Sequence, residues 1–205
     1  KLLALENTIG GKVISQDYIA EAAALTQKHS LVFHLDGARV FNAAVAQGLA
    51  LADISSQFDS ASLCLSKGLG APVGSLLVSS TPVINEARRW RKMVGGGMRQ
   101  AGVLAAAGLY AINHNVDRLG DDHARAQRLA EGLLEVDGLS VVGGKAHTNM
   151  VYLSVNGGLS SSLVAACRDQ GLMFTGETLS RLVVHSGIDD SMIEQAIEIV
   201  YRVFD

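Results

Sequence analysis

The most informative feature of this sequence is an apolar run that ends at a Ser-Lys pair, with glycines directly after it. Residues 61–65 read Ala-Ser-Leu-Cys-Leu, a pattern typical of a buried strand, and Ser66, Lys67 and Gly68 follow directly. Glycines at 68 and 70 permit tight turns and close approach of the backbone. We therefore expect Lys67 at the end of a strand.

A lysine sheltered among apolar residues and glycines is unusual, because burying an ammonium costs several kcal/mol unless the charge is paired or neutralised. Burial lowers the pKa of a lysine, and the neutral amine is a nucleophile toward carbonyl groups. One use of such an amine is a Schiff base with pyridoxal phosphate (PLP). By itself a Ser-Lys-Gly sequence is more typical of a surface lysine in a glycine-rich loop, so this interpretation of Lys67 depends on partner residues.

A first partner follows the preceding predicted strand. Residues 31–35 form an apolar run typical of a buried parallel strand, and Asp36 stands where that run gives way to Gly37 and a helix-like segment, 39–47. The carboxyl ends of strands carry the ligand sites of open α/β sheets. A carboxylate there can hold the protonated ring nitrogen of PLP, although an Asp before a Gly is more often a turn residue or a helix cap. Asp36 and Lys67 together fit PLP better than either alone.

Three motifs in this order resemble the low-specificity L-threonine and L-allo-threonine aldolases, with bacterial L-allo-threonine aldolases as the nearest match. They are His-Leu-Asp-Gly-Ala-Arg at 34–39, Leu-Ser-Lys-Gly-Leu-Gly-Ala-Pro-Val-Gly-Ser at 65–75, and Arg-Trp-Arg-Lys-Met-Val-Gly-Gly-Gly-Met-Arg-Gln at 89–100. The resemblance runs from about residue 5 to the C-terminus. It implies a PLP-dependent, transferase-like fold of the aspartate-aminotransferase type I. This would be an α/β large domain, N-terminally incomplete in this chain, with a small α+β C-terminal domain.

The activity implied by the resemblance is that of an aldehyde-lyase. It would cleave L-allo-threonine, L-threonine and related β-hydroxy-α-amino acids to glycine and an aldehyde. The resemblance makes Lys67 the catalytic residue that bonds to PLP and gives the cofactor-binding residues as Asp36, Arg39, Lys67, Lys92 and Arg99. Ser66, beside the lysine, is a further candidate for cofactor binding through a hydrogen bond to the phosphate. It gives Arg39 and Arg181 as ligands of the substrate carboxylate. Lys92 and Arg99 would reach the cofactor phosphate of a neighbouring subunit, which implies a dimer with shared sites and, by family, a homotetramer.

Two further residues have a chemical rationale of their own. Arg181 leads a predicted strand at 181–185, and a planar guanidinium is a natural bidentate clamp for an α-carboxylate. Without the resemblance, a solvated arginine at a strand edge is the more ordinary interpretation. His34 lies two residues before Asp36, so both side chains leave the strand on one face, and we favour a positioning role for His34 over that of a base.

Elsewhere the periodicity predicts further strands and helices, with a domain boundary near Asn115 that gives domains 1–115 and 116–205. In the first domain we expect a strand at 2–6, a helix from 16 to about 29 capped by Ser15, a strand at 74–79, and a small-residue helix at 101–112. A helix opened by Thr81-Pro82 should bury Val83, Ala87, Trp90 and Val94. In the second domain we expect a long helix, strands at 139–142 and 150–155, a helix from Ser160 or Ser161 to Gly171, and a last helix at 190–204.

Composition and charge narrow the functional classes. The chain has 205 residues, 48% of them hydrophobic, and a net charge of -3, so the basic run Arg88–Lys92 is better explained by the helix C-terminus than by nucleic acid. The two cysteines, Cys64 and Cys167, are interpreted as buried thiols in a reducing compartment, and no signal peptide or convincing membrane span is visible, so a cytoplasmic protein is expected. His147, His185 and the cysteines lack metal-ligand spacing, so we expect no metal site.

Two alternatives remain open. Another PLP enzyme of the same fold, such as a decarboxylase or a desulfurase, would share Asp36 and Lys67, although the Met-Arg-Gln segment and Arg181 argue against it. The chain could also be a truncated, inactive fragment that keeps only folding or subunit contacts.

Overall fold

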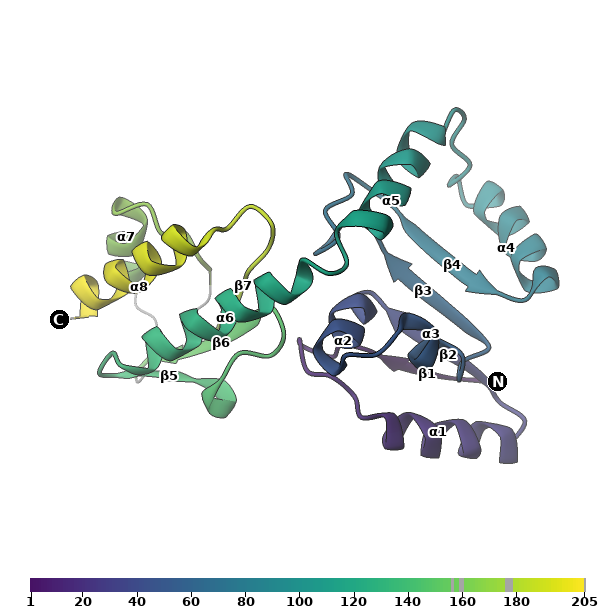
Figure 1. Cartoon of the computed structure of the whole chain (residues 1–205), viewed down its shortest axis with the longest axis horizontal. Coiled ribbons are helices and arrows are strands. Elements are labelled where there is room, and N and C mark those ends of the chain that lie inside the picture. The colour runs from purple at the N-terminus through teal and green to yellow at the C-terminus, as the bar shows by residue number, and fades with distance from the viewer. Residues whose placement is uncertain (156, 159–160, 176–178, 205) are drawn as a thin grey trace. The chain divides into compact units, whose positions relative to one another are not determined.

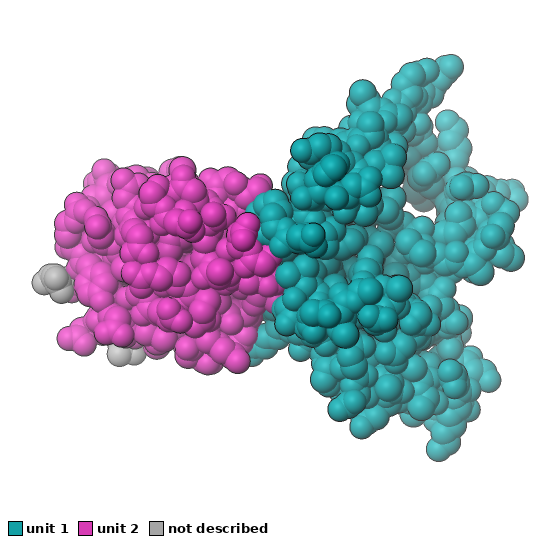
Figure 2. All heavy atoms as spheres, viewed as in Figure 1, with its two compact units in different colours: residues 1–119 teal, residues 120–205 magenta. Residues whose placement is uncertain are grey.

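The computed structural model describes residues 1–155, 157–158, 161–175 and 179–204, and the chain divides into two compact units (Figure 1). The first unit comprises residues 1–119 and the second comprises residues 120–205 (Figure 2). The division falls after Leu119, close to the boundary that the sequence predicts after Asn115. That these units are the domains of the protein stays a prediction.

The first unit is built on a four-stranded sheet. Its strands are β1 (Leu2–Glu6), β2 (Val32–Gly37), β3 (Ser60–Cys64) and β4 (Ser75–Ser79), in the order β1-β2-β3-β4. The first three are parallel, and β4 pairs antiparallel with β3. The register places Glu6 opposite Asp36 and Asp36 opposite Ser62. The carboxyl ends of the three parallel strands therefore lie at one edge of the sheet. This is the edge at which the sequence predicts a ligand site.

The helices of the first unit begin and end close to the local signals in the sequence. They are α1 (Gln16–Lys28), α2 (Val40–Gln47), α3 (Leu51–Ser55), α4 (Thr81–Met93) and α5 (Gly102–His114). The predicted cap of α1 is confirmed, because the Ser15 side chain accepts a hydrogen bond from the Tyr18 amide. In α5, an added Cβ on Gly108 would lie 3.0 Å from Leu65 Cδ1. This close approach is what the small residues of α5 permit.

One face of the sheet carries the core of this unit. Phe33 and Leu35 of β2 are 2% and 0% exposed, and Ile19 from α1 and Val40 from α2 are fully buried in the same cluster. His34 and Asp36 alternate with the buried residues of β2 and so leave the opposite face, as predicted. Asp36 thus combines an exposed side chain with a backbone fixed by the sheet.

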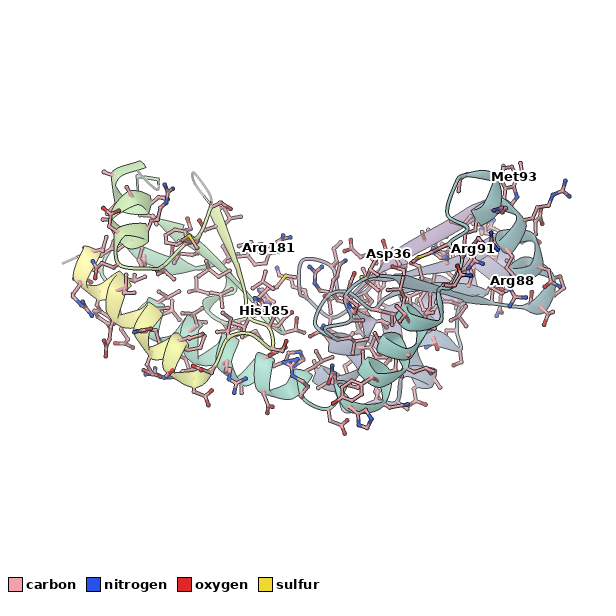
Figure 3. The ribbon with its side chains drawn as sticks, turned by 90° about the horizontal axis from the view of Figure 1, so that it is seen from above. Asp36, Arg88, Arg91, Met93, Arg181 and His185 are labelled. Atoms are coloured by element: carbon pink, nitrogen blue, oxygen red, sulfur yellow. The ribbon has the colours of Figure 1, made fainter. Side chains whose placement is uncertain are left out.

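The predicted burial of α4 is wrong. The stripe that the pattern placed inside consists of Val83, Ala87, Trp90 and Val94. Trp90 is 56% and Val94 is 77% exposed, and no residue of α4 is buried. The periodicity correctly gives a helix with an apolar face, but it does not say what covers that face, and nothing in the described part of the chain buries it. Arg88 and Arg91 on the same helix are also exposed (Figure 3).

The second unit is an α+β arrangement. Its sheet is antiparallel, with the order β5 (Leu139–Val141), β6 (Met150–Val155), β7 (Leu179–Val183). Its helices are α6 (Leu119–Leu134), η1 (Val142–Gly144), α7 (Ser161–Asp169) and α8 (Asp190–Phe204). β7 begins two residues before the predicted strand, and the helix cap predicted at Ser160 or Ser161 lies outside the described side chains. The predicted α/β and α+β classes are confirmed.

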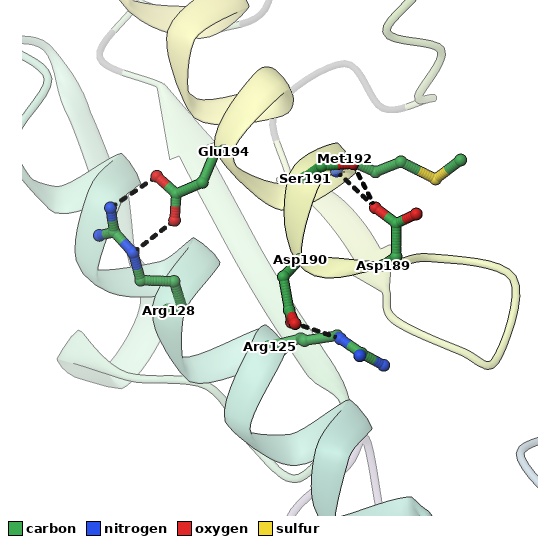
Figure 4. A network of polar contacts seen from close by, with 7 residues as sticks. All are labelled: Arg125, Arg128, Asp189, Asp190, Ser191, Met192 and Glu194. Carbon is green, nitrogen blue, oxygen red and sulfur yellow. Dashed lines mark hydrogen bonds and ion pairs between the residues drawn. The ribbon is translucent and has the colours of Figure 1, made fainter.

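Helices α6 and α8 are connected by two ion pairs (Figure 4). Arg125 Nε lies 2.7 Å from Asp190 Oδ1, and the Arg128 guanidinium contacts both carboxylate oxygens of Glu194 at 2.7 Å. The Arg128 pair is half exposed on both sides, so it contributes little to stability. Among the described residues, no helix has the length and apolar character needed to cross a membrane.

Candidate active site

Asp36, the next-to-last residue of β2, has a fixed backbone and a carboxylate that is only partly engaged. Its carbonyl accepts a hydrogen bond from the Asn7 amide at 3.0 Å, and its Oδ1 accepts one from the Ala38 amide at 3.1 Å. Its Oδ2 has no hydrogen-bond partner among the described residues. This oxygen is therefore available to accept a hydrogen bond from a protonated nitrogen of a ligand.

Lys67 lies in a tight loop directly after β3. The Gly70 amide donates to the Lys67 carbonyl at 2.9 Å, and the Ala71 amide donates to the Leu65 carbonyl at 3.0 Å. The expectation that Lys67 is sheltered is wrong for this chain, because its side chain is exposed while Leu65 and Leu69 on either side are buried. The apolar residues around the lysine hold the loop backbone and do not cover the amine.

Two side chains from distant sequence positions fasten this lysine loop, residues 67–71. Asn115 Nδ2 donates to the Leu69 carbonyl at 2.7 Å, and Arg118 Nη1 donates to the Gly68 carbonyl at 3.2 Å. An added Cβ on Gly68 would lie 2.8 Å from Leu119 Cδ2, so this glycine is needed for close packing. Neither contact was predicted from the sequence. The sequence indicates only that a helix breaks near Asn115. It does not indicate that the Asn115 side chain contacts Leu69.

Ser66 and Cys64 adjoin the lysine. Cys64 Sγ and Ser66 Oγ are 3.5 Å apart. Partial burial by itself raises the pKa of the Cys64 thiol, but hydrogen bonds from Ser66 and the positive charge of Lys67 outweigh this effect, so the pKa is lowered. Both cysteines are free. The prediction of two buried thiols holds for Cys167 but is wrong for Cys64, which alternates with Leu63 and faces away from the core.

The other predicted residues of this edge are Arg39 and His34. Arg39 is half-buried directly before α2, and its carbonyl accepts a hydrogen bond from the Asn42 amide in the first turn of that helix. His34 Nδ1 lies 2.8 Å from Ser60 Oγ on the neighbouring strand, so its ring is oriented from within the sheet. The strand ends thus bring Asp36, Arg39, Ser66 and Lys67 to one edge of the first unit.

The remaining predicted residues stand on other elements. Lys92 is in the last turn of α4 and Arg99 follows seven residues later, and both are exposed. Arg181 belongs to the second unit, where it is exposed in the middle of β7 opposite Tyr152 (Figure 3). In the described part of the first unit, no hydrogen bond or ion pair connects Lys92 or Arg99 to Asp36 or Lys67.

Asn7 and Thr8, which follow β1 beside Asp36, were not singled out by the sequence. They are 0% and 1% exposed, and Asn7 Oδ1 accepts a hydrogen bond from the Ile14 amide. Asn7 Nδ2 and Thr8 Oγ1 are buried without a hydrogen-bond partner in the described structure. Such atoms cost about 1–3 kcal/mol each. Within the same described ranges, no group of three or more His, Cys, Asp and Glu side chains is placed to hold a metal ion.

Comparisons with known proteins point to one family. A family model described as Beta-eliminating lyase matches residues 1–156. The chain is 45% identical over 195 residues to the low specificity L-threonine aldolase of Escherichia coli K12, covering 95% of this chain and 58% of that protein. It is 42% identical over 212 residues to an Arabidopsis thaliana protein named "Probable low-specificity L-threonine aldolase 2", covering 100% of this chain and 60% of that protein. The chain therefore spans less than two thirds of the length of either relative.

Solved structures give the fold. A protein of Exiguobacterium sp. 255-15 described as "Putative aromatic amino acid beta-eliminating lyase/threonine aldolase" matches with a TM-score of 0.85 and 20% identity, covering 99% of this chain and 62% of that chain. An SPT structure that contains PLP matches with a TM-score of 0.72 and 18% identity, covering 99% of this chain and 54% of that chain. These neighbours confirm the predicted fold class.

Proposed function

The chain belongs to the beta-eliminating lyase family, and from that premise we propose that the whole protein is a PLP-dependent lyase. Its proposed substrates are L-allo-threonine, L-threonine and related β-hydroxy-α-amino acids, which it would cleave to glycine and an aldehyde. The observation that carries the proposal is the placement of Asp36 at the carboxyl end of β2 and of Lys67 in the loop that follows the adjacent parallel strand β3. The relatives named L-threonine aldolases support this choice of reaction over others.

The residues at the sheet edge fit the chemical groups of PLP. When bound, PLP supplies an aldehyde that bonds to an amine and a ring that accepts electrons from the substrate. Lys67 offers an exposed amine on a loop whose backbone is fastened. Asp36 offers an unengaged carboxylate oxygen, which would accept a hydrogen bond from a protonated ring nitrogen. Ser66, exposed beside the lysine, would donate to the phosphate.

The cations are assigned to the anionic groups of cofactor and substrate. Arg39 and Arg181 are the proposed ligands of the substrate α-carboxylate, because a guanidinium binds a carboxylate through two parallel hydrogen bonds. Arg39 is also a proposed neighbour of the cofactor. Lys92 and Arg99 are the proposed ligands of the phosphate belonging to a neighbouring subunit.

The assembly and location follow as parts of the same proposal. If Lys92 and Arg99 serve a neighbour, the working form is a homodimer with shared sites, and we propose that two dimers form a tetramer. We also propose a cytoplasmic location, because the free thiols Cys64 and Cys167 suit a reducing compartment.

The proposal is tested by measuring glycine release from L-allo-threonine with the whole protein. Lys67→Ala should abolish turnover because the nucleophilic amine is lost. Asp36→Asn should lower turnover by about 10- to 100-fold, the range expected for losing a charge-assisted hydrogen bond. Lys145→Ala, which removes an exposed lysine of the second unit, is the matched control and should leave turnover unchanged.

Two results would contradict the proposal. Glycine release that survives Lys67→Ala would contradict the assignment of Lys67. A wild-type protein that releases carbon dioxide or sulfide from amino acids, and no glycine from allo-threonine, would point instead to a decarboxylase or a desulfurase of the same fold.

A further inference from the structure

The C-terminus of α4 folds back on itself through glycines. The helix ends at Met93, and Gly95 has a φ of 87°, a left-handed conformation that favours glycine. The Gly96 amide donates to the Arg91 carbonyl at 2.8 Å, and the Gly95 amide donates to the Lys92 carbonyl at 3.3 Å. These two hydrogen bonds form a Schellman motif, which satisfies the last carbonyls of the helix.

Gly97, the next residue, lies directly against the side chain of Lys92. A Cβ added to Gly97 would be 2.7 Å from Lys92 Cδ, 3.5 Å from Lys92 Nζ and 3.7 Å from Lys92 Cα. The methylene stem of Lys92 therefore crosses the space that a side chain at position 97 would fill. Gly97 does not have a positive φ, so its backbone does not itself require glycine. What the position requires is the absence of a side chain.

The Lys92 ammonium at this elbow is free to bind an anion. Within the described ranges it forms no ion pair or hydrogen bond, and the same holds for Arg99, two residues beyond Gly97. A lysine on a flexible stem loses much rotamer freedom when it binds a ligand, so a stem whose path is already set by packing against the backbone binds more tightly. The elbow thus provides a way to orient one cation before the anion arrives.

We propose that Gly97 is a positioning residue: its missing side chain lets the Lys92 stem lie across the glycine elbow, residues 95–97, and so orients the ammonium toward the cofactor phosphate. This inference rests on the proposed function, in which Lys92 binds the phosphate of PLP. It adds a role for Gly97, which acts only through Lys92.

A double-mutant cycle in the whole protein tests the inference through cofactor affinity. The dissociation constant of PLP is measured spectroscopically for wild type, Lys92→Ala, Gly97→Ala and the double variant. Gly102→Ala is the matched control, because an added Cβ there meets nothing within 4 Å and the residue is exposed. Pyridoxal, which lacks the phosphate, is titrated in parallel.

The expected pattern is non-additive. Lys92→Ala should weaken PLP binding about tenfold or more, as expected for losing a charge-assisted contact. Gly97→Ala should cause a large part of that loss, no further loss when Lys92 is already Ala, and no loss for pyridoxal. Gly102→Ala should bind PLP as the wild type does.

The contrary outcomes separate the two claims. If Lys92→Ala weakens binding but Gly97→Ala matches the Gly102→Ala control, the role of Gly97 is refuted and the phosphate assignment stands. If the loss from Gly97→Ala persists in the Lys92→Ala background, Gly97 acts by another route and the inference fails. If Lys92→Ala leaves PLP affinity unchanged, both the phosphate assignment and the inference fail.

Discussion

Replacing Asn115 with Ala removes the shorter of the two side-chain hydrogen bonds that fasten the lysine loop. Asn115 Nδ2 donates to the Leu69 carbonyl at 2.7 Å, and Leu69 is only 2% exposed, so water cannot readily take over the contact. Among the described residues, this carbonyl accepts no other hydrogen bond. Leaving a buried acceptor unsatisfied costs about 1–3 kcal/mol, so we expect the free energy of unfolding to fall by that amount.

The assay is denaturant unfolding followed by circular dichroism, with Asn113→Ala as the matched control. Asn113 is an exposed asparagine of α5, two residues earlier, and no hydrogen bond of its side chain is found in the described structure. Its replacement should change the free energy of unfolding by less than about 0.5 kcal/mol. Equal stabilities for the two variants would show that the Asn115 side chain does not fasten the loop.

Two further predictions concern other parts of the chain. Gly132→Ala should destabilise the second unit by about 1–3 kcal/mol despite the better helix propensity of alanine, because an added Cβ would lie 2.5 Å from Ile197 Cδ1. Thermal unfolding checks this, and an unchanged or higher melting temperature would contradict it. Cys64 should be alkylated at lower pH than Cys167, because its pKa is lowered whereas burial raises the pKa of Cys167. Ser66→Ala should shift the Cys64 labelling curve to higher pH, and an unshifted curve by mass spectrometry would contradict the proposed hydrogen-bond effect.

Local signals explain why the elements could be predicted. Ser15 supplies the side-chain cap of α1, Gly48 ends α2 with a φ of 63°, and Pro82 stands in the first turn of α4. Each signal acts through neighbouring backbone groups, so it is visible in the sequence. The motif order also led to the family, which the comparisons confirm.

Burial and long-range contacts were less predictable. The apolar face of α4 was expected inside, yet Trp90 is exposed, because periodicity describes one helix and not the surface that covers it. Cys64 was expected to be buried because its neighbours are apolar, but alternation along β3 turns it to the other face. The hydrogen bond from Asn115 to Leu69 joins residues 46 positions apart, and no local pattern encodes such a contact.

The site itself was predictable only in part. Asp36 and Lys67 could be predicted to lie at the same edge of the sheet, because each follows an apolar run that is recognisable as a strand. The adjacent parallel strands β2 and β3 bring both residues to that edge. The roles of Lys92, Arg99 and Arg181 come from the resemblance and stay predictions. Gly97 could not be singled out by sequence, because only the path of the Lys92 stem shows what its missing side chain makes room for.

In the proposed enzyme, Lys67 forms the covalent bond to the cofactor. The most direct measurement is borohydride reduction of the whole protein after reconstitution with PLP, followed by peptide mapping with mass spectrometry. We expect one pyridoxyl group on the peptide that contains Lys67, none on the peptide that contains Lys92, and no labelling in Lys67→Ala. A pyridoxyl group on a different lysine, or equal labelling of Lys67→Ala, would show that Lys67 does not hold the cofactor.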